Sequence, residues 1–500
     1  MRFNEQAGLP RVERRQFLRG AALAGVVGAV SRAGHTGELR AVEASRGGPA
    51  PVFDDNRPNY LFAAREAARW IRSAETKADG GSNWLPQPDH PQIKATVSPP
   101  DGFYSGAAGT ILFFIELAEV TGDKSYLDDA RRGGDYLIRS QRPASSAAPS
   151  ALAGAEYSFY TGLAGTAYAL AELAKATGDA PYRNAAWSAA DMLLAAAKPM
   201  GAGTGWMGWP GLTGNAGVVL ALLSLADLLG DKAEALRAAA IRAGDRVVEQ
   251  GIADPRGGVR WEGMPPAFLE EPEETYWPGF QLGTSGVTFA LARLGAATGE
   301  KRFTAAAETG ALHLRRIATV KGEAALIHYR EPDLKDMFYL GYCNGPAGTA
   351  RSFYQLYLAT KDPLHLRWTE MLARGVMVSG IPEKQTPGFW NVVCQCCGSA
   401  GVIDLFIGLW AATGRKDYLA FARQVADQMV SRESDLDGKG YRWYQAYTRV
   451  KPWDVTAETG YMIGAAGIGT ALLHLHMAEA GAYRRTVRLP DDPFPAVRPV

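Results

Sequence analysis

Hydrophobic and polar positions along the chain form two kinds of helical pattern. After the glycine turn at Gly106, the segment with Ile111, Leu112, Phe114, Ile115 and Leu117 is apolar on nearly every side, which is typical of a helix that is buried all round. The segment after the Gly122-Asp123 turn carries a single stripe at spacing i, i+4, i+7 and i+11, which indicates an amphipathic surface helix. That stripe runs through Tyr126, Ala130, Gly133 and Leu137. The two patterns together predict a helical hairpin.

The hairpin pattern recurs seven times after residue 100. Each unit opens with a Gly-x-x-Gly turn, and in six units a second turn, usually built on glycine, follows sixteen residues after the first glycine. Glycine suits the end of one helix, and the aspartate that often follows it suits the start of the next. A register repeated this often predicts a repeat architecture. The first glycines are Gly106, Gly162, Gly214, Gly283, Gly345, Gly398 and Gly464.

Two helices without partners predict how the repeats close. An amphipathic segment from Tyr60 to Lys77 precedes the first unit, and the last buried helix, from Gly467 to Ala480, has no outer helix after it. Pairing the two gives an all-α fold, an (α/α)7 toroid of seven inner and seven outer helices over residues 57–482. An open solenoid is the alternative, and it would need polar caps at both ends. Short strands are expected in linkers such as 441–449.

The two ends of the chain are predicted to lie outside the ring. Residues 1–44 hold Arg14-Arg15-Gln16-Phe17-Leu18 and an apolar run from Ala21 to Val30, the pattern of a twin-arginine signal peptide with its linker. This predicts export through the twin-arginine translocase to the periplasm or the cell exterior. The apolar run is too short for a permanent span, so no stable membrane insertion is expected. Residues 483–500 are expected to form a proline-rich, extended tail.

Charge and chain direction locate the face on which a site is expected. The net charge is +1 and charged residues make up 21% of the 500, so no nucleic-acid partner is expected. Because all inner helices run the same way, their glycine-rich N-termini meet at one face, where backbones can approach closely. The long linkers 251–280, 320–340 and 431–462 reach this face, the predicted mouth of the ring.

All four cysteines of the chain lie in two of the glycine turns. Cys343 and Cys396 stand two residues before the first glycine of units five and six, and Cys397 follows Cys396. Neighbouring units bring these three thiols to adjacent helix N-termini, which lower thiol pKa values. Three thiolates with one open position indicate a catalytic zinc site. Cys394 is either a fourth ligand or a spare thiol. The other residues at the Cys343 register position are Tyr104, Tyr160, Leu212, Gln281 and Met462.

With these motifs the chain resembles the lanthionine cyclase (LanC-like) family over roughly residues 58–480. The seven Gly-x-x-Gly hairpins, Tyr-Cys-Asn-Gly at 342–345 and Cys-Cys-Gly at 396–398 carry the resemblance. It implies an α/α toroid with a zinc ion. Cys343 and Cys396 then fall on the family's cysteine ligands, and Cys397 falls on its histidine.

The resemblance also implies a reaction. A zinc-activated thiol adds to a dehydrated serine or threonine in a peptide and forms a thioether, or glutathione is added instead. The expected substrate is therefore a peptide or a small thiol. Where the family carries a histidine in the fourth repeat, this chain has Leu282, next to Gln281. His328 and Asp336, in the linker that leads to Cys343, are the candidate catalytic residues. His474, in the last buried helix, is expected to be a core histidine.

Three alternatives stay open at the level of the sequence. In an oxidising compartment the four cysteines can pair as disulfides, in three full pairings. A carbohydrate-active enzyme on an α/α toroid would use two mouth carboxylates beside tryptophans; Glu262, Glu274 and Glu458 are candidates. A non-catalytic binding protein would use a zinc or disulfide site for stability, with all four cysteines as ligands.

Overall fold

The computed structural model describes residues 58–78, 80–90, 99–141, 153–264, 275–332, 337–446 and 448–498. The chain divides into two units, Met1–Asp54 and Asp55–Val500, and all described residues belong to the second. The signal peptide expected in residues 1–44 lies outside the described residues. Every helix in the described ranges lacks the length or the apolarity needed to cross a membrane.

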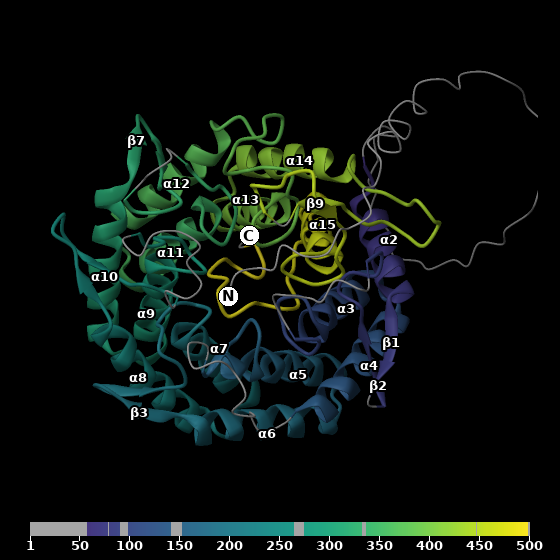
Figure 1. Cartoon of the computed structure of the whole chain (residues 1–500), viewed down its shortest axis with the longest axis horizontal. Helices are drawn as coiled ribbons and strands as arrows, with labels where there is room; N and C mark the ends of the chain where they lie inside the picture. The colour runs from purple at the N-terminus through teal and green to yellow at the C-terminus, as the bar shows by residue number, and fades with distance from the viewer. Residues whose placement is uncertain are drawn as a thin grey trace, which may run out of the picture. The chain divides into compact units, whose positions relative to one another are not determined.

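Fourteen α-helices in the described part of the chain form two concentric rings (Figure 1). Each inner helix packs on the next, and the last packs on the first, so the ring is closed. The predicted (α/α)7 toroid is confirmed, and an open solenoid is excluded. The inner helices are α3 (Ala107–Thr121), α5 (Leu163–Thr177), α7 (Asn215–Leu229), α9 (Thr284–Thr298), α11 (Pro346–Thr360), α13 (Ser399–Thr413) and α15 (Ala465–Glu479).

Each outer helix packs mainly on one inner helix. As predicted, the N-terminal helix α2 packs on the last inner helix, α15, although the two lie at opposite ends of the described chain. The outer helices are α2 (Tyr60–Ser73), α4 (Lys124–Ser140), α6 (Ala180–Ala196), α8 (Ala233–Glu249), α10 (Lys301–Ile317), α12 (Pro363–Met377) and α14 (Lys416–Val430). A short 3₁₀ helix, η2 (Ala155–Tyr157), precedes α5.

Short strands occur only as two-stranded antiparallel hairpins in the described linkers. One pair, β9 with β10, lies where strands were expected, near 441–449. The pairs are β1 (Glu75–Ala78) with β2 (Gly81–Trp84), β3 (Lys198–Met200) with β4 (Gly203–Gly205), β5 (Ile252–Ala253) with β6 (Val259–Arg260), β7 (Thr319–Lys321) with β8 (Ala324–Leu326), and β9 (Gln445–Ala446) with β10 (Val455–Thr456).

The inner helices begin and end at the predicted turns. The first glycine of each Gly-x-x-Gly turn is the N-cap residue of its helix. At the other end, Gly122, Gly178, Gly299 and Gly414 adopt the left-handed conformation that closes a helix. Unit five places Lys361 at this position, also left-handed, with φ 62°.

A chain of backbone hydrogen bonds joins neighbouring glycine turns around the ring. It connects the residues that the sequence places two positions before the first glycine, and each bond runs from an N–H of one turn to a carbonyl of the next. The bonds run from Gln281 N to Cys343 O (2.7 Å), Cys343 N to Cys396 O (2.9 Å), Cys396 N to Met462 O (2.8 Å), Met462 N to Tyr104 O (2.8 Å) and Tyr104 N to Tyr160 O (2.8 Å).

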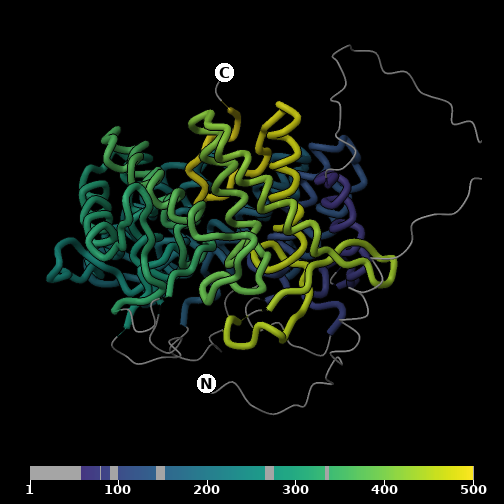
Figure 2. The backbone as a smooth tube through the Cα atoms, turned by 90° about the horizontal axis from the view of Figure 1, so that it is seen from above, coloured from purple at the N-terminus to yellow at the C-terminus, as the bar shows by residue number. Residues whose placement is uncertain are grey.

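The segment after Ala482, predicted as an extended, proline-rich tail, is largely buried in its described part. Residues 483–497 run without a helix but fold back on themselves, and Arg485 N donates to Ala496 O at 2.8 Å. We call this segment the C-terminal hairpin. It lies inside the ring, in yellow in Figure 1, and Figure 2 shows it from the side at one end of the ring. Its Phe494 is fully buried against Gly408 of α13.

Substituting Lys361→Gly is expected to raise the free energy of unfolding by about 1 kcal/mol, because a side chain in the left-handed region is strained and glycine is not. Lys361 is the only non-glycine residue with positive φ in the described ranges. Denaturant titration of the two chains would measure the difference. The matched control is Lys361→Ala, which keeps the Cβ atom and should bring no gain. Equal effects of glycine and alanine would contradict this explanation.

Candidate metal centre

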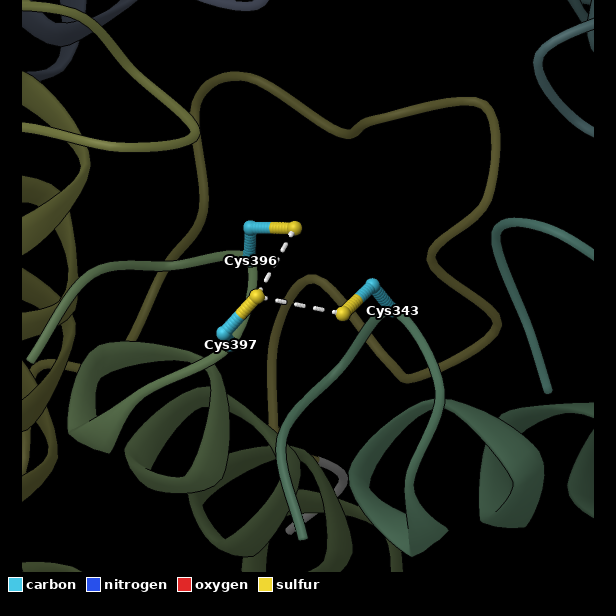
Figure 3. A group of neighbouring side chains, drawn as sticks. All are labelled: Cys343, Cys396 and Cys397. Atoms are coloured by element: carbon cyan, nitrogen blue, oxygen red, sulfur yellow. Dashed lines mark hydrogen bonds between the residues drawn. The ribbon is translucent and has the colours of Figure 1, made fainter. Parts of the chain in front are cut away.

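Three cysteine side chains come together at the glycine turns of units five and six (Figure 3). The sulfur of Cys397 lies between the other two, 3.2 Å from the sulfur of Cys343 and 3.6 Å from that of Cys396. All three sulfurs lie within 4.8 Å of one another. In the described residues no histidine or carboxylate joins this group.

The backbone positions the three sulfurs. Cys343 lies in the turn before α11, and Cys396 and Cys397 lie in the turn before α13. The 2.9 Å bond from Cys343 N to Cys396 O holds the two turns edge to edge. Gly341 permits this approach, because a Cβ atom there would stand 2.3 Å from the carbonyl oxygen of Cys397. The helix N-termini that follow favour negative charge at the sulfurs.

The dimensions of the group fit a metal ion. Metal–sulfur bonds of about 2.3 Å in a tetrahedral site place the sulfurs about 3.8 Å apart; two observed separations, 3.2 and 3.6 Å, are slightly shorter, and the third is at most 4.8 Å. Cys343 and Cys396 are 4% and 2% exposed, whereas Cys397 is partly exposed.

Hydrogen bonds divide the three thiols into one acid and two weak acids. The pKa of Cys396 is lowered well below its usual value, because the thiols of Cys343 and Cys397 and the hydroxyl of Tyr104 donate to its sulfur and together outweigh burial. The pKa values of Cys343 and Cys397 are raised, since both thiols act as donors and are buried. These hydrogen bonds favour the thiolate form at Cys396 over the other two sulfurs.

Cys394 lies outside the three-sulfur group. Its sulfur accepts a hydrogen bond from the backbone N–H of Cys397 at 3.5 Å, and its own N–H donates to Gln445 Oε1 at 3.0 Å. All four cysteines are free thiols in the structure. The group can therefore hold a metal with three ligands and keep one coordination position for another molecule.

Two further residues of the site were not singled out from the sequence. The amide oxygen Oε1 of Gln281 accepts from the Cys396 thiol at 3.4 Å, and Tyr104 donates to the same sulfur. Both occupy the register position of Cys343 and Cys396, two residues before the first glycine. That register was the available signal, because it places their backbones in the same chain of hydrogen bonds.

Of the two catalytic candidates, the structure describes His328 but not Asp336. The ring of His328 stacks on Phe338, with centroids 4.2 Å apart, and its Nδ1 lies 3.8 Å from Glu331 Oε1. Asp336 lies outside the described residues. In the same linker, Tyr339 interacts electrostatically with the cysteines. Its pKa is raised by burial, by the adjacent Tyr329 and by Cys397. The two tyrosine rings stack with centroids 3.9 Å apart.

A buried charged network lies inside the ring. His474 is the core histidine expected from the sequence, with Nδ1 3.0 Å from Asp404 Oδ1 and Nε2 3.4 Å from Glu116 Oε2. Burial and Arg485 lower its pKa, but the two carboxylates outweigh them and raise it to about 9. Glu116 also accepts from the backbone N–H of Val487 in the C-terminal hairpin at 3.0 Å. His474 is therefore positively charged at neutral pH.

Comparison with known proteins gives one family and a set of similar folds. The family model described as "Lanthionine synthetase C-like protein" matches residues 98–482. Nisin cyclase has a similar structure, with a TM-score of 0.57 and 15% identity over 86% of this chain and 97% of that chain. At this identity the likeness shows the fold.

Two sugar-modifying enzymes are also among the similar structures. Cellobiose 2-epimerase from Bacillus thermoamylovorans B4167 has a TM-score of 0.42 and 12% identity over 65% of this chain and 89% of its own. A sugar epimerase from a ruminal bacterium has a TM-score of 0.45 and 12% identity over 84% and 99%. No curated protein matches the chain in sequence.

His474→Gln is expected to lower the free energy of unfolding by about 3 kcal/mol near pH 6, because the imidazolium between two carboxylates is lost. A pKa raised from 6.5 to about 9 stabilises the fold fully below pH 6.5, and this contribution disappears as the pH rises to 9. The difference between the wild type and the variant should therefore shrink over this window. Unfolding titrations at pH 6 and pH 9.5 measure it.

The matched control for this prediction is His476→Gln, on the same helix α15. Burial lowers the pKa of His476 below its usual value, so its replacement should not bring the loss of stability between pH 6.5 and 9 that is expected for His474. An NMR titration that gives His474 an ordinary imidazole pKa would contradict the prediction directly.

Proposed function

The chain belongs to the lanthionine synthetase C-like family, and from this premise we propose that Cys343, Cys396 and Cys397 bind a zinc ion and activate a thiol. The activated thiol adds to an electrophilic acceptor of the dehydroamino-acid type in a peptide. Alternatively, the thiol is glutathione, which is joined to such an acceptor. The observation that carries the proposal is the group of three sulfurs within 4.8 Å at the N-termini of α11 and α13.

The donor set supports zinc as the metal. Cysteine thiolates are soft ligands, and three of them with an open position suit a catalytic zinc ion. Bound zinc supplies a Lewis acid that lowers the pKa of a thiol reaching the open position. The partly exposed Cys397 marks the side from which that thiol enters. The N-termini of α11 and α13 offset part of the negative charge that three thiolates gather.

Side chains around the sulfurs adjust this charge. Tyr104 donates its hydroxyl proton to a hydrogen bond with Cys396, and Gln281 has an amide group that can also donate once Cys396 is a thiolate. Hydrogen bonds to thiolates hold them in place and spread their charge. We keep His328, in the linker to Cys343, as the proposed donor of the proton that completes the addition; Asp336 remains a proposed partner.

Substrate and location are part of the same proposal. The similar fold of nisin cyclase supports a peptide substrate. The twin-arginine pattern in residues 1–44 supports action outside the cytoplasm. Because this route carries folded proteins, the chain would take up its metal before export.

One observation favours a second candidate, a carbohydrate-active enzyme. Glu458, in the linker before α15, is buried with a hydrogen bond from Gln87 Nε2 at 3.2 Å, and burial raises its pKa to about 8. A carboxyl group that stays protonated at neutral pH is a suitable general acid for glycosidic bonds. If this candidate is correct, Glu458→Gln abolishes activity on sugars, whereas loss of Cys343 does not.

The wild-type chain, purified folded, is expected to hold one zinc ion per chain by elemental analysis. The Cys343→Ala/Cys396→Ala variant is expected to hold none, because one remaining sulfur cannot retain the ion. The matched control is Cys394→Ala, which removes a cysteine from the same turn but outside the group and should keep the zinc. A metal-free wild type, or equal zinc in all three chains, would overturn the proposal.

Activity gives an independent measurement. A peptide that contains both a dehydroalanine and a free cysteine should lose its alkylatable thiol without a change in mass, because the addition is an isomerisation. Cys343→Ala should reduce the rate to that of the buffer reaction, whereas Cys394→Ala should keep it. With glutathione as the thiol, the mass of the acceptor should rise by one glutathione. Wild-type rates equal to buffer with both thiols would exclude this acceptor class.

A further inference from the structure

We propose that the C-terminal hairpin (483–497) supports the metal centre from inside the ring, and that Asp491 and Arg485 are positioning residues for the two cysteine turns. The inference rests on the proposed function, because it takes the metal bound by the three cysteines to be zinc. It assigns a role to a segment that lies beyond the matched family region, which ends at residue 482.

The first contact reaches the turn of Cys343. Asp491, at the tip of the hairpin, is 3% exposed, and its Oδ2 accepts the hydroxyl protons of Tyr160, at 2.8 Å, and of Tyr342. The two hydroxyl oxygens also lie 2.7 Å apart. Tyr342 directly precedes Cys343 in the chain. One carboxylate therefore fixes the side chain next to the first sulfur ligand.

The second contact reaches the turn of Cys396. Gln395 directly precedes this cysteine, and its amide donates a hydrogen bond to Asp404 of α13. The hairpin residue Arg485 has its Nη2 3.6 Å from Asp404 Oδ1 and also donates to the Asp404 backbone oxygen at 3.5 Å. The residue before the second sulfur ligand is thus connected to the hairpin through one aspartate.

The charges that make these contacts depend on one another. Arg485 pairs with Asp492 at the hairpin tip, and Arg351 of α11 lies 3.7 Å from Asp492 Oδ1, with its guanidinium 5.4 Å from the centre of the Tyr342 ring. All are nearly fully buried. Buried charges remain stable only when they are paired and hydrogen-bonded. Without the hairpin, Arg351 and Asp404 would lose partners directly behind the cysteine turns.

The hairpin also fills the ring. The cavity that remains between it and the inner helices has a volume of about 10 Å³, enough for the centre of one water molecule. Its wall includes Tyr342, Gln395, Asp404, Arg485 and Asp491. The hairpin contacts described above reach the residues beside the sulfur ligands, so the hairpin acts on the sulfurs by holding the turns. Contacts that hold the metal ligands in place without touching the metal orient those ligands. Their loss lowers the affinity for the metal about 10- to 100-fold.

The test measures metal binding rather than turnover. Asp491→Asn and Tyr342→Phe are each expected to weaken zinc binding about tenfold or more in a chelator competition, and to shift the sulfur-to-metal absorption bands of the Co²⁺-substituted protein. Because both act through one contact, the double variant should be no weaker than the worse single one. A purely structural role would lower thermal stability and leave the Co²⁺ spectrum unchanged.

The matched control is Glu172→Gln. Glu172 is an equally buried carboxylate inside the ring, and it accepts from Tyr168, whose hydroxyl also donates to the hairpin backbone at Arg488 O. It belongs to unit two, which carries no cysteine, so its replacement should leave zinc affinity and the Co²⁺ spectrum at wild-type values.

Each outcome separates the two proposals. Wild-type zinc affinity and Co²⁺ spectrum in Asp491→Asn would overturn the role of the hairpin and leave the proposed function standing. A wild-type chain that binds zinc but adds no thiol would overturn the reaction only. A wild-type chain without metal would overturn both. If Asp491→Asn does not fold, Tyr342→Phe, which removes a single oxygen atom, decides the question by the same two measurements.

Discussion

The structure depends on the close approach of neighbouring glycine turns. A Cβ atom at Gly348 would stand 2.1 Å from the carbonyl oxygen of Tyr342 and 2.4 Å from the Cβ of Phe280, which belongs to the preceding unit. Gly401 is confined in the same way by Gln395. Only glycine permits this spacing. Because the turns lie backbone to backbone, their hydrogen bonds run around the ring, and two cysteine turns can present three sulfurs to one point.

Two polar layers follow from this arrangement. The sulfurs occupy the layer at the turns, where helix N-termini favour negative charge. Beneath them lies a layer of paired charges, in which Arg351, Arg485 and His474 meet the carboxylates of Asp404 and its neighbours. Tyrosine hydroxyls at Tyr342 and Tyr160 connect the layers. The outer layer contains the three sulfurs, and the inner layer contacts the residues that precede Cys343 and Cys396.

The features that depend on the register of the glycine turns could be predicted from the sequence. Seven turns in one register were enough to predict the closed ring, the pairing of α2 with α15, and the convergence of Cys343 with Cys396. The C-terminal segment was predicted as an extended, proline-rich tail, and its folding back into a buried hairpin was not predicted. The partners that bury Asp491 and Arg485 lie on distant helices, and no local pattern reveals such partners. Tyr104 shares the register position of Cys396, and this register was the signal available for their contact, which spans two units of the ring.

The pairing of the first and last helices also constrains how the protein is made. Since α2 packs on α15, the N-terminal helix has no lasting partner until nearly the whole chain has left the ribosome. The hairpin that fills the ring is made later still. Contacts between such distant segments form slowly and only after synthesis is complete. A chain that ends before α15 therefore lacks the helix that closes the ring, and a chain that ends before residue 483 lacks the segment that packs inside it.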